Sequence, residues 1–188
     1  MKKIVFIVMA FIALTAFKGV DGIWKNDSPH SQLGFTVSHL GIADVSGTFN
    51  DFTVTVRSAK NDFSDASFEM SAKTSSIDTR VEARNNHLKT ADFFDVDQYP
   101  TLTFKSTSIK SIGKNKYKLS GALTMHGITK PIVLDLFYRG STENPMSKKQ
   151  TAGFQITGII KRTDFDVGTK FPAPMLSNEV HIKADEFA

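Results

Sequence analysis

The chain has 188 residues, with 23 Lys and Arg against 19 Asp and Glu and no cysteine. This length suits one domain whose core is large enough to need neither metals nor disulfides. The absence of cysteine excludes a disulfide framework, thiol chemistry and a lipid-modified cysteine as membrane anchor.

Residues 1–22 are predicted to be a secretory signal peptide. Lys2 and Lys3 form its basic start, and the apolar stretch 4–13 is short for a bilayer span. Small residues at 13–16 place cleavage between about residues 16 and 22. A retained anchor is less favoured, because no basic flank follows the apolar stretch.

The mature chain is then a single domain, residues 23–188, in the periplasm or outside the cell. Without Lys2 and Lys3 the balance is 21 basic against 19 acidic residues, a net charge of +2. This charge gives little support for a nucleic-acid partner, and we expect none.

The mature chain alternates apolar and polar residues with a period of two, which predicts antiparallel strands with one wet face. The alternating runs are, in chain order, 33–37, 52–56, 68–72, 102–104, 119–125, 134–136, 154–156 and 180–184. Short turns are predicted at 113–115, 127–129 and 140–147. About eight strands joined in this way favour a meander that closes into a barrel, because closure removes the sheet edges.

One segment between the third and fourth runs breaks the alternation. Residues 79–88 predict a short helix, with Thr79 as N-cap and Glu82 completing a capping box. Val81 and Leu88 would share one face of this helix. Pro100 is expected to close the connection to the next strand, because it cannot donate to a ladder.

The inward phase of the strands leaves two interpretations open. A barrel of about eight strands is filled by its own side chains or holds one small ligand, and an apolar stripe is usually ordinary core. The residues proposed to face inward and bind a ligand are Phe35, Val37, His39, Phe68, Met70, Phe104, Leu119, Leu123, Leu134, Leu136, Phe154 and Ile156. Within this set His39 is either a contact for a ligand head group at the barrel mouth or a satisfied histidine at the barrel end.

Four motifs in order resemble the YceI-like family, whose members include polyisoprenoid-binding periplasmic proteins. They are Trp24 with the stretch 28–52, and the stretches 76–107, 121–136 and 153–168, which together cover nearly the whole mature chain. The third reads GALTMHGITKPIVLDL and the fourth reads GFQITGIIKRTDFDVG. Asp166 departs from the family pattern, which usually has Gly there, and Asp tolerates a positive φ better than a branched residue.

The resemblance implies an all-β fold, an extended lipocalin-like eight-stranded antiparallel β-barrel with one short helix and a long apolar tunnel. It implies an exported carrier or storage protein that binds a polyisoprenoid or another long-chain lipid, with no cofactor and no catalysis. The alternative is a lipid-acting enzyme that uses His39 or His87 at the tunnel mouth. Transient contact with a membrane and a homodimer stay open as further partners.

The sequence gives less support for a metal site or for catalytic carboxylates. The five histidines lack the spacing of metal ligands, so no metal site is expected. Asp92, Asp95 and Asp97 fit a solvated loop better than paired catalytic carboxylates. Arg80, Arg162 and Asp164 match family motifs and are interpreted as structural partners of loops at a barrel end.

Overall fold

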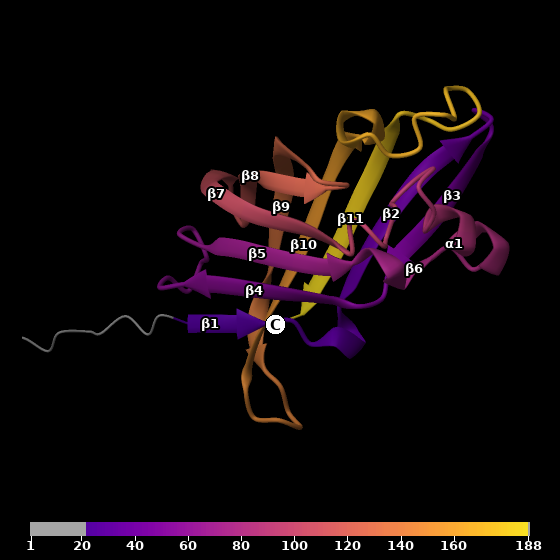
Figure 1. The fold of residues 1–188 in the computed structure, drawn as a ribbon. Helices are drawn as coiled ribbons and strands as arrows, with labels where there is room; N and C mark the ends of the chain where they lie inside the picture. Colours follow the sequence, from indigo (N-terminus) through magenta and orange to yellow (C-terminus); the bar gives the residue numbers. More distant parts are fainter. Residues whose placement is uncertain (1–21, 188) are drawn as a thin grey trace, which may run out of the picture.

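The computed structural model describes residues 22–187 (Figure 1). The signal peptide predicted for residues 1–22 therefore lies, except for its last residue, outside the described residues. The strands are β1 (Gly22–Lys25), β2 (Gln32–His39), β3 (Ala43–Phe49), β4 (Phe52–Ser58), β5 (Ser67–Lys73), β6 (Ile77–Asp78), β7 (Thr101–Gly113), β8 (Lys116–Met125), β9 (Ile128–Glu143), β10 (Gln150–Lys161) and β11 (Glu179–Phe187). One α-helix, α1 (Glu82–Leu88), and three 3-10 helices, η1 (Ser28–His30), η2 (Thr74–Ser76) and η3 (Arg162–Phe165), complete the elements of residues 22–187.

The strands form one sheet in the order β1-β4-β5-β7-β8-β9-β10-β11-β2-β3-β6. Every ladder is antiparallel, and most neighbours are consecutive in the chain, as expected for a meander. The β11–β2 ladder joins the two ends of the domain and lets the sheet curl into a half-barrel (Figure 1). The predicted fold class, all-β with a single short helix, is confirmed.

The predicted count of eight strands is wrong, because residues 22–187 form a sheet of eleven. The eight alternating runs correspond to β2, β4, β5 and β7 to β11, whereas β1, β3 and β6 were missed. The seven-residue strand β3 escaped because Gly47 interrupts its apolar phase. Gly47 pairs with Phe35 of β2, and the ring of Phe35 occupies the space that a Cβ on Gly47 would need.

The helix lies where it was predicted, but the predicted capping box is wrong. The N-cap residue is Val81, which makes no side-chain cap bond and is 45% exposed. Thr79 instead donates from its backbone N–H and its hydroxyl to Asn85 Oδ1, at 2.7 and 2.6 Å. Val81 therefore does not share a buried face with Leu88, which alone packs against the core.

Two of the three predicted turns are shifted. The turn at 113–115 lies between β7 and β8 as predicted, and Pro100 directly precedes β7. The second turn is centred on His126 and Gly127, because β9 already begins at Ile128. The third occupies residues 144–149, since β9 continues through Gly140 to Glu143.

One end of the half-barrel, which we call the packed end, is filled by buried side chains. Phe63, from the loop between β4 and β5, inserts there among rings of the strands. Its centroid lies 4.9 Å from Phe154 and from Tyr138, and 5.5 Å from Trp24. The buried phenol of Tyr117 donates to the carbonyl of Asp62 at 2.6 Å, so that its hydroxyl is not left unpaired. The packed end also contains Phe68, Leu119, Leu136 and Ala152.

Candidate functional site

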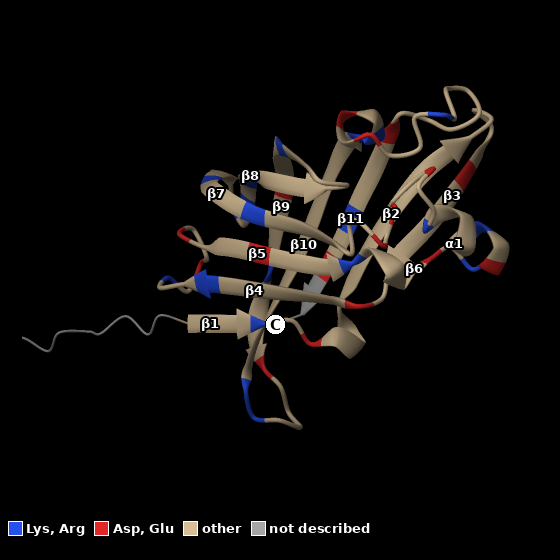
Figure 2. Cartoon of the chain, viewed as in Figure 1, with Lys and Arg blue, Asp and Glu red and all other residues tan. Residues whose placement is uncertain are grey.

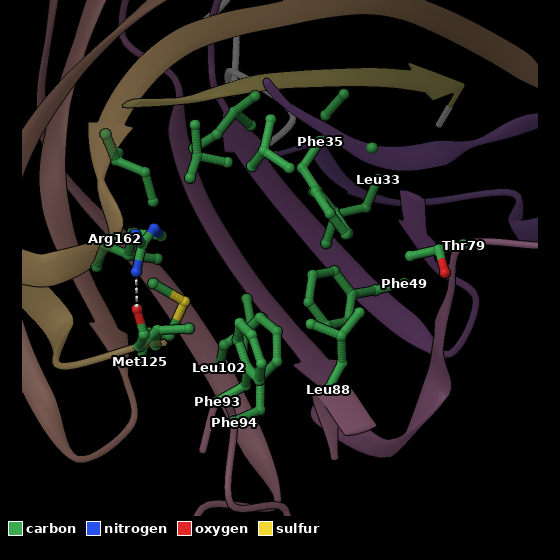
Figure 3. A pocket seen from close by; sticks show the side chains of 18 of the residues that line it. Leu33, Phe35, Phe49, Thr79, Leu88, Phe93, Phe94, Leu102, Met125 and Arg162 are labelled. Carbon is green, nitrogen blue, oxygen red and sulfur yellow. Dashed lines mark hydrogen bonds between the residues drawn. The ribbon is translucent and has the colours of Figure 1, made fainter. Parts of the chain in front are cut away.

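Beyond the packed end the interior is hollow. A cavity of about 450 Å³ lies between the strands and the loops that follow α1 and β10 (Figure 3). This volume falls within the range of about 300–1,000 Å³ typical of ligand pockets. Nine of the twelve residues predicted to bind a ligand line the cavity, namely Phe35, Val37, His39, Phe68, Met70, Phe104, Leu123, Leu134 and Ile156.

The other three predicted residues, Leu119, Leu136 and Phe154, lie outside the cavity. They face inward, as their phase requires, but they belong to the packed end and are at most 2% exposed. Met70 and Ile156, by contrast, are only half-buried although they also face inward. The void beside them accounts for this residual exposure.

Sequence reasoning missed the loop residues that roof the cavity. Phe93 and Phe94 follow α1, while Phe171 and Leu176 lie between η3 and β11. Figure 3 shows Phe93, Phe94 and Leu88 on one side of the cavity and Phe35 and Leu33 on the other. Neither pair of roof residues belongs to an alternating run. Phe93 and Phe94 lie in the stretch 76–107 that resembles the family, whereas only the apolar character of Phe171 and Leu176 in a loop could have drawn attention to them.

Arg162 organises the loop between η3 and β11. It is 4% exposed, and each of its five N–H groups faces a backbone carbonyl. The acceptors are Ser177 and Val167 at 2.9 Å, Leu176 at 3.1 Å, and Gly168 and Phe171. Burial lowers the pKa of the guanidinium. Arg162 is thus a structural partner of a loop, as predicted, and all its donors are already used.

The residue that departs from the family pattern sits directly after η3. Asp166 has φ 60°, in the left-handed region that its substitution for Gly suggested. Its backbone N–H bonds to the carbonyl of Thr163, which closes the 3-10 turn. Asp166 therefore adopts the positive φ that a Gly would adopt at this position.

Polar groups gather at the rim of the cavity. Arg84 of α1 donates from Nε to Thr79 Oγ1 and from Nη2 to the Thr79 carbonyl, each at 2.8 Å. Among the described residues that line the cavity, Thr79 carries the only hydroxyl, and there is no Asp, Glu or Ser. That hydroxyl donates to the amide oxygen of Asn85, which cannot act as a general base for it.

A second rim feature, which we call the clasp, ties the α1 side to the loop after η3. Asp92 accepts from Lys170 Nζ at 2.5 Å and lies 3.3 Å from His87 Nε2. Phe93 and Phe171 stack at 5.0 Å beneath these groups, and the ring of His87 stands edge-on to both. The bonds from Lys170 and His87 hold the pKa of Asp92 below its ordinary value.

His39, at the end of β2, is exposed and lines the cavity near Met175. Its backbone forms an isolated bridge with Leu176, which fixes it at the rim. Within residues 22–187 its ring nitrogens have no hydrogen-bond partner. The exposure of His39, His87 and Met175 marks the mouth of the cavity.

Residues 22–187 contain no group of three or more His, Asp or Glu side chains that could hold a metal ion. No helix in this range is long and apolar enough to span a membrane.

Comparison with known proteins places this geometry in context. The family model described as the YceI-like domain matches residues 24–186. A UPF0312 protein of Staphylococcus aureus is 39% identical over 141 residues, which are 75% of this chain and 80% of that protein.

Solved structures share the fold. The Burkholderia cenocepacia protein BcnA superposes with a TM-score of 0.78 at 26% identity, over 87% of this chain and 99% of its own. The YCEI protein of Campylobacter jejuni has a TM-score of 0.72 at 31% identity, over 80% and 88% of the two chains. A domain from Saccharophagus degradans, described as polyisoprenoid-binding, has a TM-score of 0.66 at 14% identity and covers 89% of this chain and 97% of its own.

Proposed function

Because this chain belongs to the YceI-like family, we propose that it binds the tail of a long apolar lipid, such as a polyisoprenoid, in the cavity. The observation that carries this proposal is the hollow half of the barrel, which is lined by apolar side chains from nine strands and closed at the packed end. The Saccharophagus degradans domain, which is described as polyisoprenoid-binding, has the same fold.

The energetics favour a chain-like ligand. Each CH₂ group that leaves water contributes about 0.8 kcal/mol, and the loss of tail flexibility offsets part of this gain. An apolar wall distinguishes tails that differ by one methylene only weakly. We therefore expect selection for a class of long apolar chains rather than for one length.

The polar end of the lipid belongs at the mouth. His39 presents ring nitrogens without a partner among residues 22–187, and it borders both the cavity and solvent. We assign it as a hydrogen-bonding contact for the lipid head. Arg162 is excluded from this role, because its five donors are committed to backbone carbonyls.

The proposed setting is outside the cytoplasm, as an exported carrier or store. The basic start and short apolar stretch of residues 1–22 support this setting. The exported protein is expected to begin between residues 17 and 23. An intact mass that still includes Met1 would count against export.

One observation speaks for the enzyme alternative, the His87–Asp92 pair of 3.3 Å at the rim. Asp92 is shared with Lys170, and the single hydroxyl in the described cavity lining is bonded to Asn85. This arrangement fits a structural clasp better than a nucleophile and its base. Binding without catalysis is accordingly the function we propose.

The test is to identify what purified protein carries. Organic extraction followed by mass spectrometry should recover an apolar lipid in near-stoichiometric amount from the wild-type protein. Leu123→Trp, which places an indole in the cavity, should remove most of the lipid while the protein stays folded. Absence of extractable lipid, together with failure to take up a long-chain isoprenoid alcohol from detergent, would refute the proposal.

A further inference from the structure

The turn between β2 and β3 and the loop before β11 meet beside the cavity mouth. The backbone N–H of Leu40 donates to the Met175 carbonyl at 3.1 Å, and that of Ser177 donates to the Ser38 carbonyl at 2.9 Å. A Cβ on Gly41 would lie 3.9 Å from Pro174. The two segments therefore form one continuous surface, at the upper right of Figure 1. We call the side chains of Leu40, Ile42, Pro174 and Met175 the apolar tip.

The apolar tip is strongly exposed. Ile42 is 87% exposed, Leu40 is 52% exposed and Met175 is 47% exposed. Met175 also lines the cavity, so the tip and the mouth share a side chain. Exposed apolar groups are ordinary when scattered, whereas a cluster beside a binding site indicates an interaction surface.

The chemistry of the turn argues against a chance arrangement. Leu40 and Gly41 have φ 53° and 71°, and the N–H of Ile42 closes the turn on the His39 carbonyl at 3.2 Å. Asn-Gly and Asp-Gly are the favoured pairs where both central residues have positive φ, and a bulky residue there is uncommon. The chain thus places a Leu where a polar residue would suit the backbone better.

The opposite end of the molecule shows the contrasting design. The connections at 59–66, 114–115 and 144–149 contain charged side chains, namely Lys60, Asp62, Asp65, Lys114, Lys148 and Lys149. Residues 40–43 and 171–178 contain no Asp, Glu, Lys or Arg. In Figure 2 these two stretches are tan, while blue and red segments lie nearby in η3 and in the start of the loop that follows it. The apolar tip itself therefore carries no charged side chain, whereas Asp92 and Lys170 of the clasp lie at another part of the cavity rim.

We propose that the apolar tip inserts into a lipid bilayer and brings the cavity mouth to its surface, so that a lipid tail passes between bilayer and cavity. This inference rests on the proposed lipid-binding function, since a tail that crossed water would lose about 0.8 kcal/mol for each exposed CH₂. A bilayer is a better occupant than a second copy of the chain. A stable protein interface buries about 800 Å² on each partner, which is far more than four side chains can bury. Four apolar side chains suffice, however, for a reversible membrane contact.

The first experiment measures flotation of the full chain with phosphatidylcholine vesicles. The test variant is Leu40→Asn combined with Ile42→Thr. It substitutes no cavity-lining residue, and it gives the turn the favoured Asn-Gly pair. The matched control is Met146→Gln combined with Ile112→Thr, which removes two exposed apolar side chains at the opposite turns. Burial of one Leu or Ile is worth about tenfold in partitioning, so the test variant should bind vesicles at least about tenfold more weakly and the control should bind like wild type.

The second experiment reports where the membrane touches. Ile42→Trp should gain fluorescence that is quenched by nitroxide-labelled acyl chains, whereas Met146→Trp at the opposite end should not. Equal flotation of test and control variants, or equal quenching at both positions, would overturn the proposal. A shift from dimer to monomer in the test variant without any change in flotation would assign the tip to a second copy and also overturn it.

Lipid extraction from the same samples separates this inference from the proposed function. Protein that retains its lipid but does not bind vesicles through the tip would refute docking and leave lipid binding intact. Protein that binds vesicles through the tip but never contains lipid would refute the proposed function instead.

Discussion

Leu119 and Leu123 lie on one strand, β8, and point to the same face, yet they have different surroundings. Leu119 is fully buried in the packed end, whereas Leu123 borders a cavity of about 450 Å³. Strand β8 itself runs without interruption between the two positions, although its neighbour β7 has a register shift there, between Ser106 and Ser108. The filling of the interior on either side differs because of the loops. Phe63 fills the barrel at one end, while Phe93, Phe94 and Phe171 cover the other end without filling it. The hollow half is thus a property of loop insertion, not of strand pattern.

The largest expected effect comes from removing a ring at the packed end. Phe154 is 1% exposed and contacts Phe63, Phe68 and Tyr138. Phe154→Ala should lower the free energy of unfolding by about 3–5 kcal/mol, measured by denaturant titration. The folded fraction should still contain its full share of lipid. Lipid loss without destabilisation would show that the two ends are not separate.

Overfilling the same strand at two positions gives the sharpest contrast. Leu119→Trp should lower the free energy of unfolding by about 1–3 kcal/mol or more, because the packed end has no room for the larger side chain. Leu123→Trp should be tolerated, since the indole enters the cavity, but bound lipid should be lost. Melting temperature and extractable lipid are measured on the same sample. A destabilised Leu123→Trp protein that keeps its full lipid content would contradict the cavity assignment.

A smaller effect is expected when a side chain beside the void is shortened. Leu136→Ala, at the packed end, should lower the free energy of unfolding by about 2–5 kcal/mol. Met70→Ala should lower the free energy of unfolding by less than Leu136→Ala does, because Met70 is half-buried and already has empty space as a neighbour. The free energies of unfolding of both lipid-free variants are measured by chemical denaturation. Equal losses in the two variants would indicate that the cavity collapses around a packed core.

The fold was largely predictable because period-two alternation follows directly from strand geometry. Alternation found β8 from residues 119–125 but missed β3, where Gly47 makes room for the ring of Phe35. Gly121 of β8 accommodates the ring of Phe104 in the same way, but β8 keeps three large apolar residues in phase around it, whereas β3 has only two. The capping box failed for a similar reason, since the hydroxyl of Thr79 found a partner in Asn85 instead.

The site was predictable only in part. Phase alone placed Leu119 and Leu123 together, although only Leu123 reaches the cavity. The roof residues Phe93 and Phe171 come from irregular loops, whose positions depend on long-range contacts such as the bonds from Arg162 to the loop after η3. No local pattern encodes these contacts, which is why the sequence left a filled and a hollow barrel both open.

The smallest expected effect concerns acid, and it compares one carboxylate at each end. The pKa of Asp92 in the clasp is lowered by its bonds from Lys170 and His87. The pKa of Asp65, beside the packed end, is lowered by the Ser58 hydroxyl at 2.5 Å and by backbone N–H groups. A carboxyl group whose pKa is lower in the folded than in the unfolded state stabilises the fold above its unfolded value of about 3.9. This contribution is lost as the pH falls through the folded pKa.

Both contributions should therefore be present at neutral pH and disappear below about pH 4, but with different consequences. Protonation of Asp92 releases the clasp, so lipid release from the wild-type protein should accelerate in acid. Asp92→Asn should release lipid faster already at neutral pH and show a weaker dependence on acid, whereas Asp65→Asn should alter acid unfolding and leave the release rate unchanged. Because the clasp is solvent-exposed, added salt should shrink the difference between wild type and Asp92→Asn. Identical release rates for wild type and Asp92→Asn across the whole pH range would show that the clasp does not control access to the cavity.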